Sequence, residues 1–332
     1  MKFKRILASV LSCALIATSL MAVTGCSDSN GSSDSKNPAE KTYTVGICQL
    51  VQHPALDAAT AGFKKALTEK LGDKVKFDEQ NAAGDSANCN TIINQFVASN
   101  VDLIMANATP AVQAAVSGTP DIPILGTSVT EYGVALGIDN FSGKTGINVS
   151  GTSDLAPLDK QAAMFKELLP EAQKVGILYC SNEANSKYQA EVVKKELTNQ
   201  GIEVAEYTFA DSNDIAQVVA KACEEVDALY IPTDNQCANN AELINNTAEV
   251  AGKPIIAGEE GICKGCGIAT LSISYDNIGY ATGLMAYEIL VNGADISEMA
   301  IQYDDAPVYK YMADRCTKYN ITVPENYVAI EG

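Results

Sequence analysis

The chain has 332 residues and a formal net charge of −18 at pH 7, from 41 acidic and 23 basic residues. So acidic a protein lacks the basic face that nucleic-acid binding needs. Arg315 is the only Arg after the first 25 residues. An arginine clamp for a ligand carboxylate is therefore nearly excluded, and an anion would be held by backbone N–H groups, hydroxyls, amides or Lys.

The first residues have the layout of an export signal. Three basic residues within the first five positions precede an uncharged apolar run over residues 6–23. The run ends in Val-Thr-Gly directly before Cys26, and small residues before a Cys resemble a bacterial lipobox. We therefore expect residues 1–25 to be a lipoprotein signal peptide and Cys26 to be the lipidation site. A transmembrane anchor with an incidental Cys is the alternative.

Residues 26–42 are rich in Ser, Asp, Asn and Gly, and the stretch before Glu40 has no aromatic or β-branched residue to build a core. This composition predicts a disordered tether. Acyl chains on Cys26 would hold the protein at a membrane. The predicted location is the extracellular face of the cell membrane, through a lipid (palmitate-type) anchor.

The rest of the chain contains an internal repeat. Matching segments lie about 125 to 134 residues apart, which predicts two similar α/β halves. The pairs are YTVGICQL from Tyr43 with KVGILYCS from Lys174, VDLIMANATP from Val101 with VDALYIPTDN from Val226, IPILGTS from Ile122 with KPIIAGEE from Lys253, and YGVALGIDN from Tyr132 with GCGIATLSISYDN from Gly265.

The predicted fold is α/β, with two similar three-layer α/β/α lobes that have parallel sheets and are joined by a hinge. The N-terminal lobe is expected to comprise 43–152 plus 276–302, and the C-terminal lobe 153–275 plus 303–332. Ligands of open α/β sheets bind outside the carboxyl ends of the strands. Two facing lobes would therefore place two polar rims on one cleft.

The first lobe supplies several candidates for that cleft. Residues 43–50 form the first strand, and His53 and Pro54 then open an amphipathic helix over 55–71. His53 would contact a ligand through its imidazole, or else be a solvated capping residue. Thr109 would cap a later helix whose N-terminus suits an anion. Thr127 and Ser128 would present hydroxyls after the strand 122–126.

The second lobe repeats the scheme. Asn185 and Ser186 lie where the strand 174–180 gives way to a long helix, so amide, hydroxyl and free N–H groups converge. We expect the ligand carboxylate to be held by these groups and by the hydroxyls of the first lobe. Near the carboxyl end, Gly279 and Gly283 would let a helix over 278–291 pack closely on the first lobe, and a final helix is expected over 309–319.

Asp234 is the predicted acceptor for a ligand ammonium, because it directly follows a buried strand and a buried cation requires a compensating charge. Asn235 completes the same rim, and Glu259 is the second acidic candidate. Asp-Asn is also a good capping pair, so a purely structural Asp234 is the alternative.

The cysteines give no recognisable disulfide framework. Cys263 and Cys266 form the sole CxxC, set among glycines before an expected strand, which is unlike the helix-opening position of a redox motif. With one His and no second CxxC, the sequence lacks a metal set. We expect a local disulfide or two inert thiols. No cofactor is expected, because GxSxG and phosphate-binding motifs are absent.

Six motifs in order carry a resemblance to a known family. The chain after residue 42 resembles the ABC-transporter substrate-binding lipoproteins whose members bind tryptophan or phenylalanine. The motifs are HPALDAATAGF from His53, TPA from Thr109, VSGTSDLAPLD from Val149, LYCSNEANS from Leu178, YIPTDN from Tyr230 and YATGLMAYEIL from Tyr280.

The resemblance implies a type I periplasmic-binding-protein fold. It also implies a monomeric, non-enzymatic receptor that closes over an aromatic or related amino acid and delivers it to an ABC permease with its ATPase. Two alternatives remain. One is an extracellular sensor subunit for a membrane kinase; the other is an enzyme on the same fold with Cys180 or Cys237 as nucleophile, which would need a base.

Overall fold

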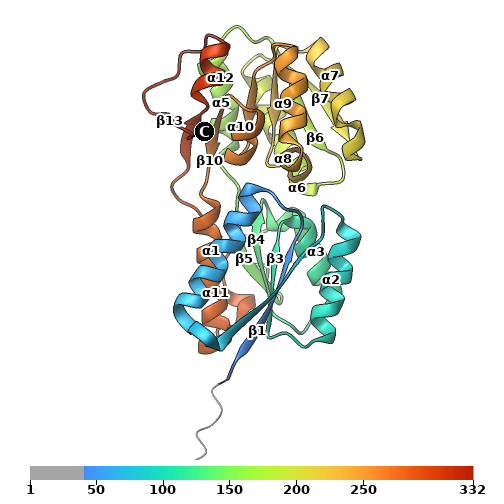
Figure 1. Ribbon diagram of the computed structural model, residues 1–332, viewed down its shortest axis with the longest axis vertical. Helices are drawn as coiled ribbons and strands as arrows, with labels where there is room; N and C mark the ends of the chain where they lie inside the picture. The colour runs from blue at the N-terminus through green and yellow to red at the C-terminus, as the bar shows by residue number, and fades with distance from the viewer. Residues whose placement is uncertain (1–40, 332) are drawn as a thin grey trace, which may run out of the picture. The chain divides into compact units, whose positions relative to one another are not determined.

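The computed structural model describes residues 41–331. The predicted signal peptide, the lipidation site Cys26 and nearly all of the predicted tether lie outside the described residues. The described chain forms two α/β lobes, one built on a six-stranded sheet and the other on a seven-stranded sheet (Figure 1). The two-lobed α/β architecture predicted by the repeat is confirmed.

The sheet of the first lobe has the strand order β11-β5-β4-β3-β1-β2, and all its neighbouring strands are parallel. Its strands are β1 (Tyr43–Gln49), β2 (Val75–Asn81), β3 (Leu103–Asn107), β4 (Ile124–Val129), β5 (Val149–Ser153) and β11 (Gln302–Tyr303). The last of these comes from near the end of the chain.

Helices cover both faces of this sheet (Figure 1). Side chains of successive residues in a strand point to opposite faces. Ile47 packs with Phe63 and Met285 on one face, and Cys48 packs with Phe96 on the other. The helices are α1 (Pro54–Leu71) and α11 (Tyr275–Asn292) on the first face, α2 (Ser86–Ala98) and α3 (Thr109–Gly118) on the second, and the short α4 (Tyr132–Leu136), with 3-10 turns η1 (Gly72–Lys74) and η3 (Ile296–Glu298).

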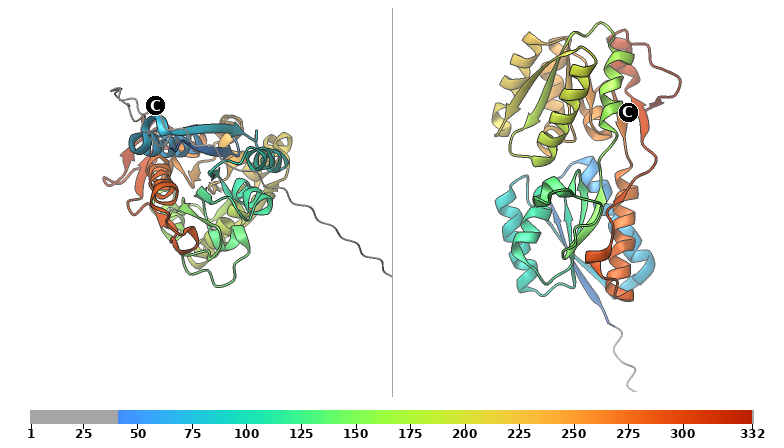
Figure 2. Two further views of the ribbon diagram at one scale, coloured as in Figure 1. Left: turned by 90° about the horizontal axis from the view of Figure 1, so that it is seen from below. Right: turned by 180° about the vertical axis from the view of Figure 1, so that it is seen from behind.

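Helices α1 and α11 approach each other very closely. A Cβ placed on Gly279 would lie 2.0 Å from the carbonyl oxygen of Ala59, and one on Gly283 would lie 2.6 Å from that of Phe63. Only glycine permits such an approach of two helix backbones. The close packing expected for these two glycines is confirmed, and it joins a late helix to the first lobe (Figure 2).

The sheet of the second lobe has the order β13-β12-β10-β9-β8-β6-β7, and β12 is antiparallel to β10. Its strands are β6 (Lys174–Cys180), β7 (Glu203–Phe209), β8 (Ala228–Ile231), β9 (Ile255–Ala257), β10 (Ala269–Ser272), β12 (Val308–Tyr311) and β13 (Val328–Ala329). Its helices are α5 (Leu158–Leu168), α6 (Ala184–Asn199), α7 (Ile215–Glu225), α8 (Asn235–Asn239), α9 (Ala241–Val250), α10 (Glu260–Cys266) and α12 (Ala313–Lys318), with the 3-10 turn η2 (Ser212–Asp214).

The final helix expected over 309–319 is partly wrong. Residues 308–311 form the strand β12, which lies between β13 and β10, and the helix begins only at Ala313. The Val-Tyr-Lys-Tyr sequence is rich in β-branched and aromatic residues, which favour a strand where a partner such as β10 is available. The helical expectation overlooked this local preference.

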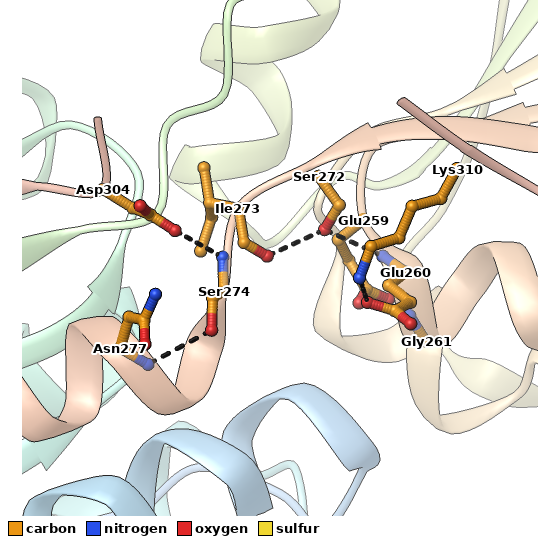
Figure 3. A network of polar contacts seen from close by, with 9 residues as sticks. All are labelled: Glu259, Glu260, Gly261, Ser272, Ile273, Ser274, Asn277, Asp304 and Lys310. Carbon is orange, nitrogen blue, oxygen red and sulfur yellow. Dashed lines mark hydrogen bonds and ion pairs between the residues drawn. The ribbon is translucent and has the colours of Figure 1, made fainter. Parts of the chain in front are cut away.

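The chain passes between the lobes at residues 154–157, 273–274 and 304–307 (Figure 2). Within residues 41–331 no helix has the length and apolar character needed to cross a membrane. The hinge segments are tied together, because Asp304 Oδ2 accepts a hydrogen bond from the backbone N–H of Ser274 at 2.7 Å (Figure 3).

Candidate ligand-binding site

A small cavity lies between the lobes, beyond the carboxyl ends of both sheets. Its volume is about 10 Å³, roughly the space of one water molecule, so the lobes are drawn together in this structure. Residues from both lobes and from the hinge line it: His53, Leu56, Ser128, Asp154, Asn185, Thr233, Asp234, Asn235, Ala238, Glu259 and Tyr275.

His53 connects the two lobes. It is the N-cap residue of α1 but makes no capping hydrogen bond with its side chain. Its Nε2 lies 3.3 Å from Asn235 Oδ1 in the other lobe. A second link is formed by Gln236 Nε2, which donates to the carbonyl oxygen of Gly84 at 3.2 Å. The alternative role predicted for His53, a capping side chain, is therefore not observed, because its imidazole contacts Asn235 instead.

The hydroxyl of Ser128 reaches the cavity without a hydrogen-bond partner in the described chain. Ser128 also has a φ of 55°, a strained conformation for a non-glycine residue that is typical of functional sites. The adjacent Thr127 is committed elsewhere, since its Oγ1 lies 3.1 Å from Thr152 Oγ1. Thr109 is buried at the start of α3 and does not line the cavity.

Asn185 and Ser186 begin α6, as the sequence indicates, but they play different parts. Asn185 Nδ2 donates to Glu183 Oε2 at 3.0 Å and to the carbonyl oxygen of Thr233 at 3.0 Å. Its Oδ1 has no partner within the described residues and belongs to the cavity lining. Ser186 Oγ instead donates to Asp234 Oδ2 at 2.7 Å and does not line the cavity.

The carboxylate of Asp234 is fully used inside its own lobe. Its Oδ1 accepts from the N–H of Cys237 at 2.8 Å, which caps α8. Its Oδ2 accepts from the N–H of Cys180 at 2.7 Å and from Ser186. The capping alternative is thus realised in the structure, and the ammonium contact of Asp234 stays a prediction.

Glu259 has a similar role at the start of α10. Its carboxylate accepts from the backbone N–H groups of Gly261, at 2.6 Å, and Ile262. Burial raises the pKa of Glu259 to about 7, against the effect of these two N–H donors. Next to it, Glu260 pairs with Lys310 outside the cavity (Figure 3).

Asp154 was not among the predicted site residues, although it lies in the motif VSGTSDLAPLD. It follows β5 at the hinge, and its carboxylate accepts from two hydroxyls, Thr130 Oγ1 and Tyr275 OH, both at 3.0 Å. Its own backbone N–H also favours the charged form, but no hydrogen bond from the backbone N–H of another described residue reaches it. Burial raises its pKa to about 6, and the two hydroxyls partly oppose this. Asp154 is therefore the least compensated carboxylate of the cavity.

Glu183 lies just behind the cavity and was also missed. It accepts from the backbone N–H groups of Asn235 and Gln236, both at 3.0 Å, and from the Asn235 amide at 2.6 Å. Burial and the nearby Asp234 raise its pKa. None of the residues lining the cavity is Lys or Arg. The site therefore concentrates acidic groups without a basic side chain to balance them.

The two cysteines considered as nucleophiles, Cys180 and Cys237, are buried. Within residues 41–331 all cysteines are buried free thiols, and burial raises the pKa of Cys180 to about 12 and that of Cys237 well above its usual range. Protonated thiols are weak nucleophiles, which counts against the cysteine-enzyme alternative. Cys263 and Cys266 lie within helix α10 rather than in a loop, so the expected loop setting was wrong, while the two inert thiols were among the expected outcomes.

Three buried polar atoms of the cavity wall lack a partner within the described residues: His53 Nδ1, Ser128 Oγ and Asn185 Oδ1. Each of these side chains is at least nine-tenths buried. Buried polar groups are normally hydrogen-bonded. Three unpaired atoms on one cavity therefore indicate a polar ligand that bonds to them from between the lobes.

Comparison with known proteins places the chain in a family. A family model described as ABC transporter substrate binding protein matches residues 44–330. A tyrosine-binding protein of Clostridioides difficile (strain R20291) is 37% identical over 307 residues, covering 90% of this chain and 88% of that protein.

Two solved structures agree. An ABC domain from Streptococcus pneumoniae in complex with L-Trp is 30% identical, with a TM-score of 0.83 over 87% of this chain and 100% of that one. The ligand-free, open structure of a substrate-binding protein with adhesive properties from Clostridium difficile is 36% identical, with a TM-score of 0.67 over 87% and 99%. The better fit to the L-Trp complex, despite lower identity, agrees with the drawn-together lobes. The chain has the type I periplasmic-binding-protein fold and belongs to the family of ABC transporter substrate-binding proteins.

Proposed function

We propose that this protein is a lipid-anchored extracellular receptor of an ABC importer. Its lobes close over an aromatic amino acid, which it delivers to a membrane permease and its ATPase. The observation that carries this proposal is the cavity between the lobes, whose lining combines three buried carboxylic acids with three residues that have an unpaired buried polar atom, and includes no Lys or Arg.

The acidic side of the cavity suits a ligand ammonium. A cation that loses its water on closure requires a nearby negative charge. Asp154 fits this role better than Asp234 or Glu259, because the residues that donate to it supply two hydroxyls, whereas the other two carboxylates accept backbone N–H groups at helix starts. The ammonium would supply the missing compensation and would also pair with Asn185 Oδ1.

The ligand carboxylate would be read by Ser128 and by the N-terminus of α3. The backbone N–H of Ala108, just before α3, donates to the carbonyl oxygen of Thr127 at 3.0 Å, so the helix start lies beside Ser128. A helix N-terminus attracts an anion through its dipole, although here Pro110 has no N–H and those of Ala111 and Val112 already donate to the carbonyl oxygen of Ala108. This arrangement holds a carboxylate without arginine, as the composition requires.

An aromatic ligand is supported by the relatives, one named for tyrosine and one solved with L-Trp. The present cavity is too small for any amino acid, so entry requires the lobes to part. Hinge closure around a ligand is the usual motion of two-lobed binders. The segments at 154–157, 273–274 and 304–307 are where this bending would occur.

A thermal-shift screen of the twenty amino acids tests the binding function. At 100 times Kd, a ligand stabilises the folded state by about 2.7 kcal/mol. We expect the aromatic amino acids to raise the melting temperature of a fragment that begins at residue 41. If none of the twenty does so at millimolar concentration, the proposed ligand class is wrong.

Anchoring and transport need separate tests in cells. Replacing Cys26 with Ala should abolish labelling by a palmitate analogue and leave the signal peptide uncleaved. Deleting the gene should reduce uptake of the radiolabelled ligand, and the Asp154→Asn variant should fail to restore it. Normal uptake in the deletion strain would instead favour the sensor alternative.

A further inference from the structure

The imidazole of His53 has a fixed hydrogen-bonding pattern. Its Nε2 lies 3.3 Å from Asn235 Oδ1. The Asn235 amide cannot be turned round, because its Nδ2 donates to Glu183 Oε2 at 2.6 Å. Its oxygen therefore faces His53 and accepts a hydrogen bond. It follows that the proton of a neutral His53 is on Nε2.

The other ring nitrogen is then an acceptor. Burial lowers the pKa of His53, while Asn235 and Asp57 act weakly in the opposite direction, so the imidazole is neutral near pH 7. In this tautomer Nδ1 carries a lone pair. The atom is buried and has no partner in the described chain, and its residue lines the cavity. It requires a donor from between the lobes.

The neighbourhood of His53 differs from the rest of the cavity. Leu56 lies three residues after His53 on α1, and Ala238 lies three residues after Asn235 on α8. Residues three apart share one face of a helix, and both apolar side chains line the cavity. Ser128 lies in β4 and Asp154 follows β5 at the hinge. Asp234 and Glu259 precede α8 and α10, and their carboxylates accept backbone N–H groups at the starts of these helices. His53 therefore lies next to the apolar side chains of the cavity, Leu56 and Ala238, where we expect the side chain of a bound amino acid to lie.

We propose that His53 Nδ1 accepts a hydrogen bond from an O–H or N–H on the ligand's ring, and that His53 thereby makes the site prefer a phenol or an indole to a plain phenyl ring. This rests on the proposed amino-acid function. The ammonium is not the donor, because a cation is better compensated by the carboxylate of Asp154 than by a neutral imidazole. A phenyl ring would leave Nδ1 buried and unpaired, which a site of this kind disfavours.

Calorimetry with tyrosine and phenylalanine is the first test, since the two differ only in the hydroxyl. We expect tyrosine to bind at least about tenfold more tightly. His53→Gln keeps a donor near the Nε2 position but removes the Nδ1 acceptor, so the ratio of the two affinities should fall towards one. Asp154→Asn is the control, because the ammonium is common to both ligands: both should weaken and the ratio should persist.

The sole His of the chain also permits a direct test in the unaltered protein. After ¹⁵N labelling of histidine, NMR should show the neutral Nε2–H tautomer. Tyrosine should shift the Nδ1 resonance as a hydrogen-bond acceptor, whereas phenylalanine should not. This measurement decides the matter even if His53→Gln does not fold.

Failure of this inference can be told from failure of the proposed function. Equal affinity for tyrosine and phenylalanine, an unchanged ratio in His53→Gln, or an Nδ1–H tautomer would overturn the role of His53 and leave an aromatic amino-acid receptor. If neither amino acid nor tryptophan binds, the proposed ligand class and the role of His53 fall together.

Discussion

The phenol hydroxyl of Tyr275 donates to Asp154 Oδ2 at 3.0 Å, and this bond joins two of the segments that connect the lobes. Asp154 follows β5, and Tyr275 opens α11. A parallel link between Asp304 and the backbone N–H of Ser274 ties in the remaining segment (Figure 3). The hinge is therefore held by carboxylates, and one of them also faces the cavity.

Asp154→Asn should separate ligand binding from folding. The substitution keeps the shape but removes the charge that we assign to the ammonium, so affinity should fall by about 2–5 kcal/mol. Unliganded stability at pH 8 should be maintained or increased, because burial already disfavours the charged form, with a pKa of about 6. Calorimetry and urea unfolding give the two values.

Asp234→Asn is the matched comparison. Asp234 accepts from Cys180, Ser186 and Cys237 within its own lobe, so its replacement should reduce stability more than affinity. The reverse pattern, with affinity lost in Asp234→Asn and retained in Asp154→Asn, would restore Asp234 as the ammonium acceptor predicted by the sequence.

The residues at strand ends show how far the sequence could lead. A polar residue after a buried parallel strand is expected at the cleft edge, and His53, Ser128 and Asn185 do line the cavity, while their contacts with a ligand stay a prediction. The same rule placed Thr127 and Ser186 there, but these hydroxyls bond to Thr152 and Asp234 instead. The sequence pattern therefore predicts which residues lie at the edge of the sheet. It does not predict the hydrogen-bond partner of each side chain.

Asp154 was missed for a related reason. It lies next to the predicted boundary between the lobes, at 152/153, and sequence alone does not show that its carboxylate receives few hydrogen bonds. Asp234 and Glu259 gain backbone N–H donors from the helices that they precede, and Asp154 precedes none directly. Glu183 shows the opposite case, since its contact with the N–H of Asn235 spans 52 positions of sequence.

Tyr275→Phe should weaken the hinge. Removing a hydroxyl that donates to a buried carboxylate should cost about 1–3 kcal/mol of unfolding free energy at pH 8. It should also raise the pKa of Asp154 further, because the bond from Tyr275 favours the charged form. The loss, measured by urea unfolding, should therefore be smaller at pH 5.

Tyr327→Phe is the control for this change. The Tyr327 hydroxyl donates to Glu167 at 2.8 Å, away from the cavity. Its removal should cost stability but leave ligand affinity unchanged, whereas Tyr275→Phe should also weaken binding by about 1 kcal/mol. Equal affinities in the two variants would show that the Tyr275 hydroxyl does not orient Asp154 for the ligand.

Gly279→Ala and Gly283→Ala test the contact between α1 and α11. The added Cβ would lie 2.0 Å from a backbone oxygen in the first case and 2.6 Å from one in the second. Overpacking usually costs about 1–3 kcal/mol, and backbone cannot move aside as a side chain can. We expect both variants to be destabilised in thermal unfolding, with Gly279→Ala the more affected. A neutral Gly279→Ala would mean that the helices are further apart.

Ligand binding should release protons between about pH 5 and 7. Burial raises the pKa of Asp154 to about 6 and of Glu259 to about 7, from ordinary values of 3.8 and 4.5. The folded, unliganded protein therefore holds protons that the unfolded chain has lost, and its stability should fall as pH rises through this window. His53 acts oppositely: its lowered pKa costs stability below about pH 6.5.

A bound ammonium lowers the pKa values of the nearby carboxylic acids, because it favours their charged form. Affinity should therefore increase as pH rises from 5 to 7, with protons released on binding. Titration calorimetry in two buffers of different ionisation enthalpy measures that number directly, and Asp154→Asn should reduce it. If binding takes up protons or is independent of pH across this range, the cation does not sit among these carboxylates, and the acidic side of the cavity serves the hinge alone.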